Sequence, residues 1–290
     1  MLRWVRSWMG CARLAGLLVA AVLDCWLRRP TVGAEGAVWI HGWCKRVVAA
    51  MGIEFELQGV MPLGGAVVSN HLSYLDILVY SAAQPFVMVA KSEVRRWPLL
   101  GWLTSRAGTV YVERGGGPAT YAAVNAAMAG AYRSGLPVLF FPEGTTTDGK
   151  VGVLEFRRGL FHSVLNEGVA LRTAVLGYTL ADESASVAAD VCWWGDALLG
   201  PHLFRCLGLR GVRARIQFGD LVMEQADRFV LAEAARNQVA QMYEGLGVGA
   251  GRVFVGGKET ALVEALEDLF DGPVNGVCAF YGEGGAGLRG

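Results

Sequence analysis

Short apolar runs of strand length recur along the chain, separated by segments whose apolar positions repeat at helical spacing. Strands are predicted at residues 53–57, 66–69, 86–90, 108–114, 136–141, 169–178, 187–194 and 212–218. Helices are predicted at residues 38–48, 72–79, 121–132, 200–205 and 227–244, with a further one opening at 156–162. Because strands alternate with helices, we predict an α/β fold with a mostly parallel sheet flanked by helices.

Three segments carry more detailed expectations. Residues 212–218 alternate between basic and apolar side chains, which predicts a half-exposed edge strand, since charged residues suit an edge. Residues 187–194 are expected to continue the sheet. A helical piece begins at Lys91 and is interrupted by Pro98. The apolar and aromatic residues 97–103 that follow are expected in the core.

The first thirty residues differ from the rest. An uninterrupted apolar run at residues 14–23 is bounded by Arg13 and Asp24, with Trp and Arg residues on both sides. Bilayer spans need about 20 residues, so an interfacial or half-inserted helix fits the run best. A tilted span over residues 8–27 is the alternative. A signal peptide with a cleavage site at residues 32–34 is a third interpretation, which the interruption at Arg13 disfavours.

Breaks in composition divide the chain into three parts. Pro30 and the small residues after it separate a membrane-associated helix and linker, residues 1–36, from a central domain at residues 37–245. Residues 246–290 form an extension of unknown role, with a short helix predicted at 258–270 and a frayed end at 282–290. A G-x-G-x-x-G pattern at residues 285–290 is no dinucleotide site, because no helix can follow it.

Composition narrows the classes of function. Of the 290 residues, 53% are hydrophobic and 18% charged, and the formal net charge is zero. With no overall positive field, nucleic acid is not an expected partner. The six cysteines are scattered without C-x-x-C pairs, so we expect free thiols in a reducing compartment and no metal site.

Candidate chemistry is concentrated where the strand at 66–69 meets the next helix. His71 follows that strand directly, and parallel sheets place ligand sites outside the carboxyl ends of their strands. Asp76 lies five positions later, so the two side chains meet only if His71 precedes the first helical turn. His71 would then be a general base and Asp76 its orienting carboxylate. Alternatively, Asp76 only caps the helix, in a capping box with Ser73 as the N-cap residue.

Four blocks in this order resemble one family. They are N-H-L-S-Y-L-D at residues 70–76, G-T-V-Y-V-E-R at 108–114, F-P-E-G-T at 141–145, and the apolar strand after them. Together they are similar to the glycerolipid and lysophospholipid acyltransferases, typified by 1-acylglycerol-3-phosphate acyltransferase. The resemblance covers roughly residues 38–220. It implies the α/β fold of the glycerol-3-phosphate acyltransferases and an O-acyl transfer from a thioester to a lysolipid hydroxyl.

The resemblance also implies roles for individual residues. His71 would deprotonate the acceptor hydroxyl, with Asp76 holding its other nitrogen, so that attack on the thioester is direct. Arg114 would bind the acceptor's phosphate, the alternative being a surface ion pair with Glu113. Glu143, Gly144 and Thr145 would border the acceptor site, with Glu143 orienting a hydroxyl or Arg114 rather than acting as a second base.

The implied partners are a lysolipid acceptor, an acyl carrier protein or coenzyme A thioester as donor, and a membrane. No cofactor or metal is implied. The expected location is the inner (cytoplasmic) membrane, with the active site on the cytoplasmic side. Under this interpretation residues 97–103 could instead line a path for an acyl chain.

Departures from the family pattern leave the acceptor open. The family usually continues F-P-E-G-T-R-S, and here Thr146 and Thr147 replace the Arg and Ser; Arg157 or Arg158 could compensate for the missing cation. The usual proline of the fourth block is absent. The T-T pair and the W-G-D at residues 194–196 resemble the lyso-ornithine lipid acyltransferases. From the family resemblance as a whole we expect 1-acyl-sn-glycerol-3-phosphate as acceptor, giving phosphatidic acid. These departures make lyso-ornithine lipid the alternative. A different class, an inactive membrane-peripheral lipid-binding protein, is disfavoured by the intact motif residues.

Overall fold

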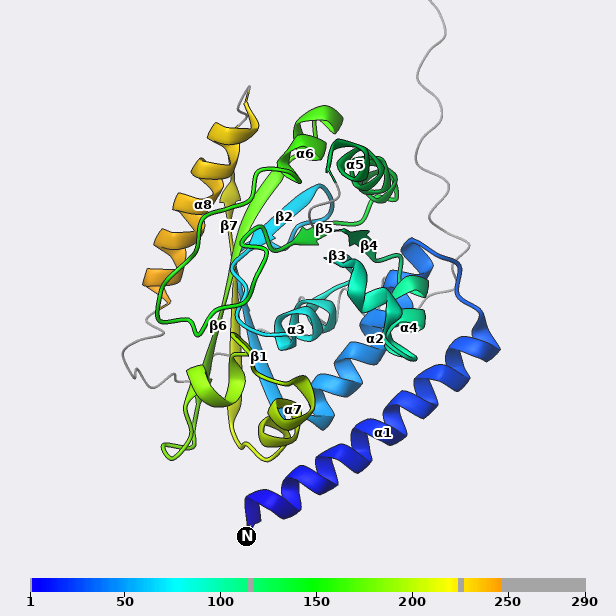
Figure 1. The fold of residues 1–290 in the computed structure, drawn as a ribbon, viewed down its shortest axis with the longest axis vertical. Coiled ribbons are helices and arrows are strands. Elements are labelled where there is room, and N and C mark those ends of the chain that lie inside the picture. Colours follow the sequence, from blue (N-terminus) through cyan, green and yellow to red (C-terminus); the bar gives the residue numbers. More distant parts are fainter. Residues whose placement is uncertain (1, 114–116, 224–226, 247–290) are drawn as a thin grey trace, which may run out of the picture. The chain divides into compact units, whose positions relative to one another are not determined.

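A seven-stranded, mostly parallel sheet forms the centre of the molecule (Figure 1). The computed structural model describes residues 2–113, 117–223 and 227–246. The strands are β1 (Ile53–Gln58), β2 (Ala66–Ser69), β3 (Val87–Lys91), β4 (Val110–Val112), β5 (Val138–Phe140), β6 (Leu171–Leu180) and β7 (Val212–Leu221), in the order β1-β7-β6-β2-β5-β3-β4. Only the β6–β7 pair is antiparallel. The predicted fold class is confirmed.

Helices cover the sheet on both faces. They are α1 (Leu2–Arg28), α2 (Ala34–Ala50), α3 (Leu75–Ala83), α4 (Leu100–Arg106), α5 (Gly117–Arg133), α6 (Phe161–Glu167), α7 (Leu199–Leu207) and α8 (Arg228–Gly245). A 3-10 helix, η1, covers Ser92–Arg96, and a π-helix, η2, covers Val187–Val191. Helix α8 packs on β6 and β7, while α2 and α3 pack together on the opposite face (Figure 1). All four residues of β2 are buried, so its carboxyl end opens from the middle of the core.

The edge position predicted for residues 212–218 is wrong. Strand β7 lies between β1 and β6, and β1 is the outer strand. The basic residues of β7 do not need an edge, because they face acidic partners across the strand pair on a partly exposed side of the sheet: Arg213 lies 3.1 Å from Glu54, and Arg215 lies 3.4 Å from Glu56. Cross-strand ion pairs therefore accommodate the alternating pattern inside the sheet.

Residues 187–194 do not continue the sheet, so that prediction is also wrong. Residues 187–191 form the π-helix, whose turn is closed by a hydrogen bond from the Cys192 N–H to the Val187 carbonyl, 2.8 Å. Asp190 accepts the Ser186 N–H at 2.9 Å. The Trp193 N–H donates to the Leu72 carbonyl at 2.9 Å, so this segment supports the turn after β2.

Other predicted elements shift at their ends. The helix expected at residues 156–162 begins at Phe161, because the Arg157 N–H donates to the Pro142 carbonyl at 2.8 Å and holds the preceding residues in a loop. Helix α5 begins at Gly117, ahead of the predicted start at residue 121. The core prediction for residues 97–103 holds for Gly101 and Leu103, whereas Leu99, Leu100 and Trp102 are exposed.

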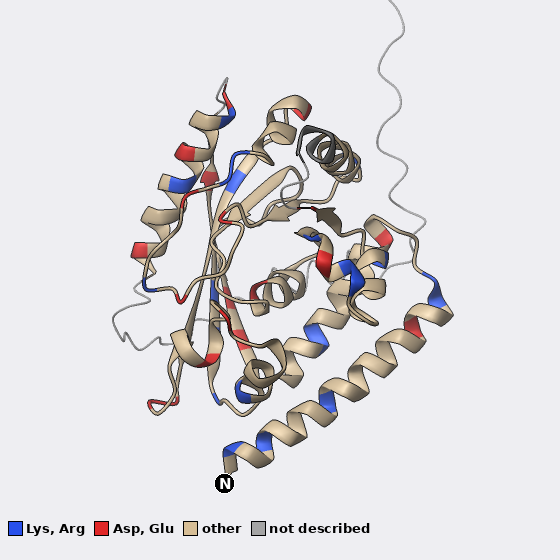
Figure 2. Cartoon of the chain, viewed as in Figure 1, with Lys and Arg blue, Asp and Glu red and all other residues tan. Residues whose placement is uncertain are grey.

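Helix α1 is attached to the domain near both of its ends. Arg3 pairs with Asp190 at 2.6 Å, and Arg6 donates to the Gly208 carbonyl at 3.0 Å. Near the other end, Asp24 accepts the indole N–H groups of Trp39 and Trp43 at 2.8 and 3.0 Å. Figure 2 shows basic residues spaced along α1, with Asp24 as its acidic residue. The helix is long and apolar enough to cross a membrane by length and composition.

The cysteines that the structure describes are free, whereas the elements predicted near the C-terminus fall outside the described residues. Cys11, Cys25, Cys44, Cys192 and Cys206 are free thiols, and Cys278 lies outside the described residues. Within the described ranges, no group of three His, Cys, Asp or Glu side chains could hold a metal ion. The helix predicted at 258–270 and the frayed end at 282–290 also lie outside the described residues.

Candidate active site

The turn that carries His71 is fixed to the sheet by Asn70. Its side chain is buried, donates to the Leu176 carbonyl at 2.9 Å and accepts the Leu176 N–H at 2.9 Å. The amide thereby continues the pairing of β2 with β6 by one step after β2 has ended at Ser69. As a result, His71 leaves the sheet at a defined point above the carboxyl ends of β2 and β5.

His71 and Asp76 meet as the sequence predicts. The His71 Nδ1 lies 2.8 Å from Asp76 Oδ2. A carboxylate only accepts, so Nδ1 carries the proton and Nε2 is left as the basic nitrogen. The Asp76 side chain is fully buried, whereas 17% of the His71 side chain is exposed. This is the arrangement in which a carboxylate fixes the tautomer of a general base that reaches a substrate.

The capping-box alternative is half correct. Asp76 Oδ2 accepts the N–H groups of Leu72 and Ser73 at 2.7 and 3.0 Å, as a capping carboxylate does. However, Tyr74 is the N-cap residue of α3, and the Ser73 hydroxyl is buried without a hydrogen-bond partner among the described residues. Capping and the contact with His71 therefore use the same oxygen of Asp76.

Two rings flank this pair. The His71 imidazole stacks on the Phe141 ring, with centroids 4.1 Å apart and planes 10° from parallel, which fixes the plane of the base. On the other side, the Tyr178 hydroxyl donates to Asp76 Oδ1 at 2.8 Å. Burial, and then the negative charge of Asp76, hold the pKa of Tyr178 well above its usual value, so it remains a donor.

Glu143 ties two loops together through main-chain groups. Its Oε1 accepts the His71 N–H at 2.8 Å, and its Oε2 accepts the Leu154 N–H at 3.0 Å. Burial raises the pKa of Glu143 to about 7, although both of these hydrogen bonds act to lower it. Both oxygens of Glu143 thus hold backbone N–H groups. That Glu143 also orients a hydroxyl or Arg114 stays a prediction, because Arg114 lies outside the described residues.

Gly144 makes room for a cation. It has a φ of +70°, and a Cβ built there would lie 2.6 Å from Arg157 Nε. The Arg157 side chain therefore crosses the glycine, whereas Arg158 lies over the Phe229 ring at 4.8 Å. Thr145 is exposed beside this turn, and the Thr147 N–H donates to the His71 carbonyl at 3.1 Å.

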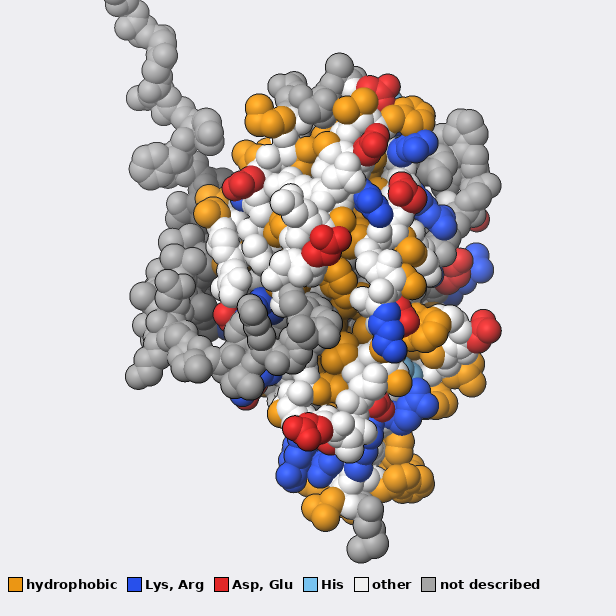
Figure 3. Space-filling view, turned by 90° about the vertical axis from the view of Figure 1, so that its left-hand side faces the viewer, with side chains coloured by type: hydrophobic (Ala, Val, Ile, Leu, Met, Phe, Trp, Pro, Cys, Tyr) orange, Lys and Arg blue, Asp and Glu red, His pale blue; other side chains and the backbone are white. Residues whose placement is uncertain are grey.

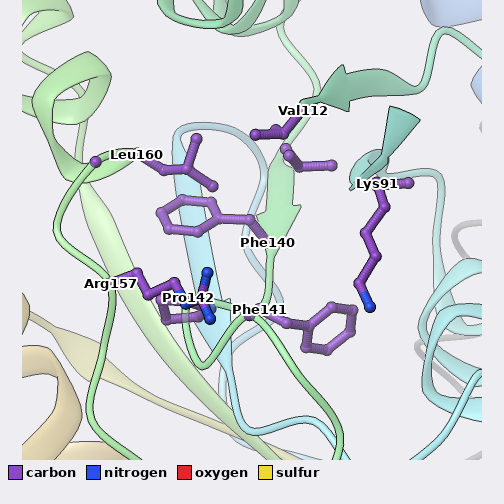
Figure 4. Close-up of a pocket in the computed structure, with 11 residues that line it drawn as sticks. Lys91, Val112, Phe140, Phe141, Pro142, Arg157 and Leu160 are labelled. Carbon is purple, nitrogen blue, oxygen red and sulfur yellow. The ribbon is translucent and has the colours of Figure 1, made fainter. Parts of the chain in front are cut away.

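A pocket of about 130 Å³ opens at the carboxyl ends of β3, β4 and β5 (Figure 4). Phe141, which stacks on His71, forms part of its wall. Lys91 and Arg157 bring two cationic side chains to an otherwise mostly apolar lining, in which Val112, Phe140 and Leu160 take part. A cavity of this kind suits an anionic group attached to an apolar chain.

The other histidines have structural partners. His202 is buried between the Tyr74 hydroxyl, 3.2 Å from its Nδ1, and the Cys192 carbonyl, 2.9 Å from its Nε2. Burial lowers the pKa of His202, so it stays neutral. His41 Nδ1 contacts the Ser81 carbonyl at 2.7 Å, and His162 is exposed.

Arg114 lies outside the described residues. Of the other predicted site residues, the structure brings together His71, Asp76, Glu143 and Gly144. Sequence reasoning missed Asn70 and Tyr178 as parts of the site. Asn70 precedes His71 directly, and a buried amide at a strand end could have suggested a bridge. Tyr178 lies in the strand at 171–180 and carried no local signal.

Comparisons with known proteins agree on one activity class. A family model described as Acyltransferase matches residues 53–176. The lyso-ornithine lipid O-acyltransferase of Pseudomonas aeruginosa is 34% identical over 245 residues, 81% of this chain and 92% of its own. The 1-acyl-sn-glycerol-3-phosphate acyltransferase of Neisseria meningitidis serogroup B is 31% identical over 200 residues, 67% of this chain and 76% of its own.

A solved structure supports the fold. The crystal structure of the 1-acyl-sn-glycerophosphate acyltransferase of Thermotoga maritima superposes with a TM-score of 0.60, covering 84% of this chain and 97% of that one. At 13% sequence identity, this likeness concerns the fold alone.

Proposed function

Because this chain belongs to the acyltransferase family, we propose that it transfers a fatty acyl group from a thioester to the free hydroxyl of a lysolipid. The observation that carries this proposal is the His71–Asp76 pair, buried on its carboxylate side and partly exposed on its imidazole side. The motif resemblance found in the sequence and the similarity to known acyltransferases over most of the chain lead to the same family.

The reaction needs no acylated residue. The acceptor hydroxyl gives its proton to His71 Nε2 while its oxygen attacks the thioester carbonyl carbon. Asp76 stabilises the imidazolium that forms and takes no proton itself. The tetrahedral intermediate then expels the thiolate, which receives the proton from Nε2. The ester and a free thiol leave, and His71 is neutral again.

Backbone N–H groups beside the base can stabilise the oxyanion. In the turn after β5, the Gly144 N–H donates to the Phe141 carbonyl at 3.1 Å, and the Thr147 N–H is bonded to His71. The N–H groups of Thr145 and Thr146 have no partner within the described part of the chain. These two are our candidates for the thioester oxygen or the acceptor headgroup.

We propose lyso-ornithine lipid as the acceptor, with 1-acyl-sn-glycerol-3-phosphate as the second candidate. Thr146 stands where the phosphate-specific pattern has an arginine, and Arg157 lies over Gly144 to supply one cation in its place. The ornithine headgroup carries a carboxylate with a single negative charge, which needs fewer cations than a phosphomonoester does. The higher identity and coverage of the Pseudomonas aeruginosa enzyme support the same choice.

The remaining assignments follow from this function. The donor is an acyl carrier protein or coenzyme A thioester, and Arg114 is a further candidate for the acceptor's anionic group. Residues 37–245 form the acyltransferase domain, and residues 1–36 attach it to the cytoplasmic face of the inner membrane through α1. The exposed apolar residues of α1, among them Leu23, Trp26 and Leu27, would face lipid.

An assay of the purified full chain tests the proposal. Each acceptor is incubated with each type of thioester, and ester product is measured. We expect product with lyso-ornithine lipid, and a loss of about 10²- to 10⁴-fold in turnover for His71→Ala, the usual contribution of a general base. His162→Ala, which removes an exposed histidine, serves as the matched control and should retain activity.

Three results would decide against parts of this proposal. Absence of product with every lysolipid would favour the inactive lipid-binding protein. Wild-type turnover in His71→Ala would show that the chemistry does not use this base. Faster turnover with 1-acyl-sn-glycerol-3-phosphate would retain the activity class and replace the acceptor.

A further inference from the structure

The carboxylate of Asp76 has two differently occupied oxygens. Oδ2 accepts three hydrogen bonds, from the N–H groups of Leu72 and Ser73 and from His71 Nδ1. Oδ1 accepts one, from the Tyr178 hydroxyl at 2.8 Å, and has no other partner within the described ranges. Asp76 is fully buried, so water does not replace a missing partner. Among the described residues, the Tyr178 hydroxyl is therefore the one donor to Oδ1 of this buried carboxylate.

The topology of the sheet places Tyr178 under the turn. Strand β6 pairs with β2 as far as Ser69 and Ala174, then runs on to Leu180 while β2 has already ended. Asn70 extends the pairing to Leu176, and Tyr178 is two residues further along the same face of β6. The backbone that anchors His71 thus also sets the position of the hydroxyl that reaches Asp76.

We propose that Tyr178 is a positioning residue of the acyl transfer, which holds the ionised Asp76 with Oδ2 towards His71 and shares its negative charge. A buried carboxylate oxygen without a donor is costly, so loss of the hydroxyl would favour rotation of the Asp76 carboxylate. The contact between Oδ2 and His71 Nδ1 would then loosen, which slows the reaction and changes the surroundings of the imidazole ring.

Tyr80 supplies a matched control. Tyr178 and Tyr80 are both fully buried, and each hydroxyl makes a hydrogen bond of 2.8 Å, Tyr80 with the Ser69 hydroxyl. Tyr178→Phe and Tyr80→Phe each remove one oxygen and leave the ring packing in place, so their losses of stability should be comparable. Only the first removes a donor from Asp76.

Two measurements test the role of Tyr178. The kinetic one rests on the proposed function, and the spectroscopic one does not. In NMR spectra of the full chain with labelled histidine at one fixed pH, the His71 ring signals are assigned by their absence in His71→Gln. We expect Tyr178→Phe to shift the ring nitrogen signals of His71, which report on its contact with Asp76, and Tyr80→Phe to leave them unchanged. This readout needs no substrate, so it remains valid if no lysolipid is a substrate.

In the assay, Tyr178→Phe should lower kcat about ten-fold and leave the KM of the acceptor unchanged, while Tyr80→Phe should change neither. Unshifted His71 ring signals in Tyr178→Phe, or the same shift in Tyr80→Phe, would overturn the proposal.

Discussion

At the scale of single residues, the site depends on small groups with several contacts each. Asp76 serves α3, the turn after β2 and His71 at once, and Asn70 links that turn to β6 in both directions. Such residues are intolerant of near-isosteric change because a substitution that preserves one contact breaks another. Gly144 is the clearest case, since its lack of a side chain defines where Arg157 lies.

Gly144→Ala should therefore alter acceptor binding more than folding. A left-handed conformation costs alanine about 1–2 kcal/mol, and the added methyl would collide with Arg157. We expect that loss of stability together with a several-fold increase in the KM of the acceptor. Gly135→Ala is the control: its φ is +79°, and nothing lies within 4 Å of the added Cβ. It should lose similar stability with no change in KM; equal KM values for the two variants would contradict the role of Arg157.

At the scale of elements, Glu143 joins the turn after β2 to the loop before α6. Below a pH near 4.5 its carboxyl is protonated in both the folded and the unfolded chain, and above about pH 7 it is ionised in both. Between these values, the folded protein binds the extra proton. The contribution of Glu143 to stability consequently falls as the pH rises through this window.

Glu143→Gln tests this dependence. The difference between the two pKa values corresponds to about 3 kcal/mol, so the stability of the variant relative to wild type should improve by that order between pH 5 and pH 8. The amide of glutamine cannot accept both N–H groups, which adds a constant loss at every pH. Denaturant unfolding at several pH values measures the difference, and a difference that stays constant with pH would contradict the buried charge.

Some elements and site residues could be predicted from the sequence, and others could not. The strands β2 and β5 are short and almost entirely apolar, and burial on both faces produces this pattern in a parallel sheet. The position of β7 was not predictable from Arg213 and Arg215, because their partners Glu54 and Glu56 are distant in sequence. The His71–Asp76 pair was predictable since both residues lie in one turn. Tyr178 was not, since its role depends on how far β6 outruns β2.

At the scale of the whole molecule, helix α1 carries many of the exposed apolar side chains. On the face seen in Figure 3, acidic and basic side chains are interspersed with apolar ones, and apolar side chains gather at the lower end, where α1 begins. Along α1, the exposed apolar residues include Leu2, Trp4, Trp8, Val19, Leu23, Trp26 and Leu27. Exposed apolar residues flanked by Trp and Arg are typical of a lipid-facing helix.

Replacing Val19 and Leu23 with lysine should weaken membrane binding of the full chain. Both are more than half exposed, at 58% and 55%, so folding should not change. Burial of one such side chain in lipid is worth about 1.5–3 kcal/mol, which predicts a loss of more than ten-fold in sedimentation with phosphatidylethanolamine and phosphatidylglycerol vesicles. Lysines at Val60 and Leu63, exposed at 69% and 87% in the turn before β2, form the control pair. Equal binding of both double variants would argue against α1 as the contact.

The two attachments of α1 fix the number of helical residues between them. Besides Arg3 and Arg6, Gly10 lies against Leu207 at the first attachment, and Asp24 accepts from Trp39 and Trp43 at the second. Gly10 and Asp24 are fourteen positions apart, a span of about 21 Å. One residue inserted between them would advance the second anchor by about 1.5 Å and rotate it by about 100°. No single movement of the helix could then restore both. Homologous chains that keep these contacts should thus keep the number of residues in this stretch.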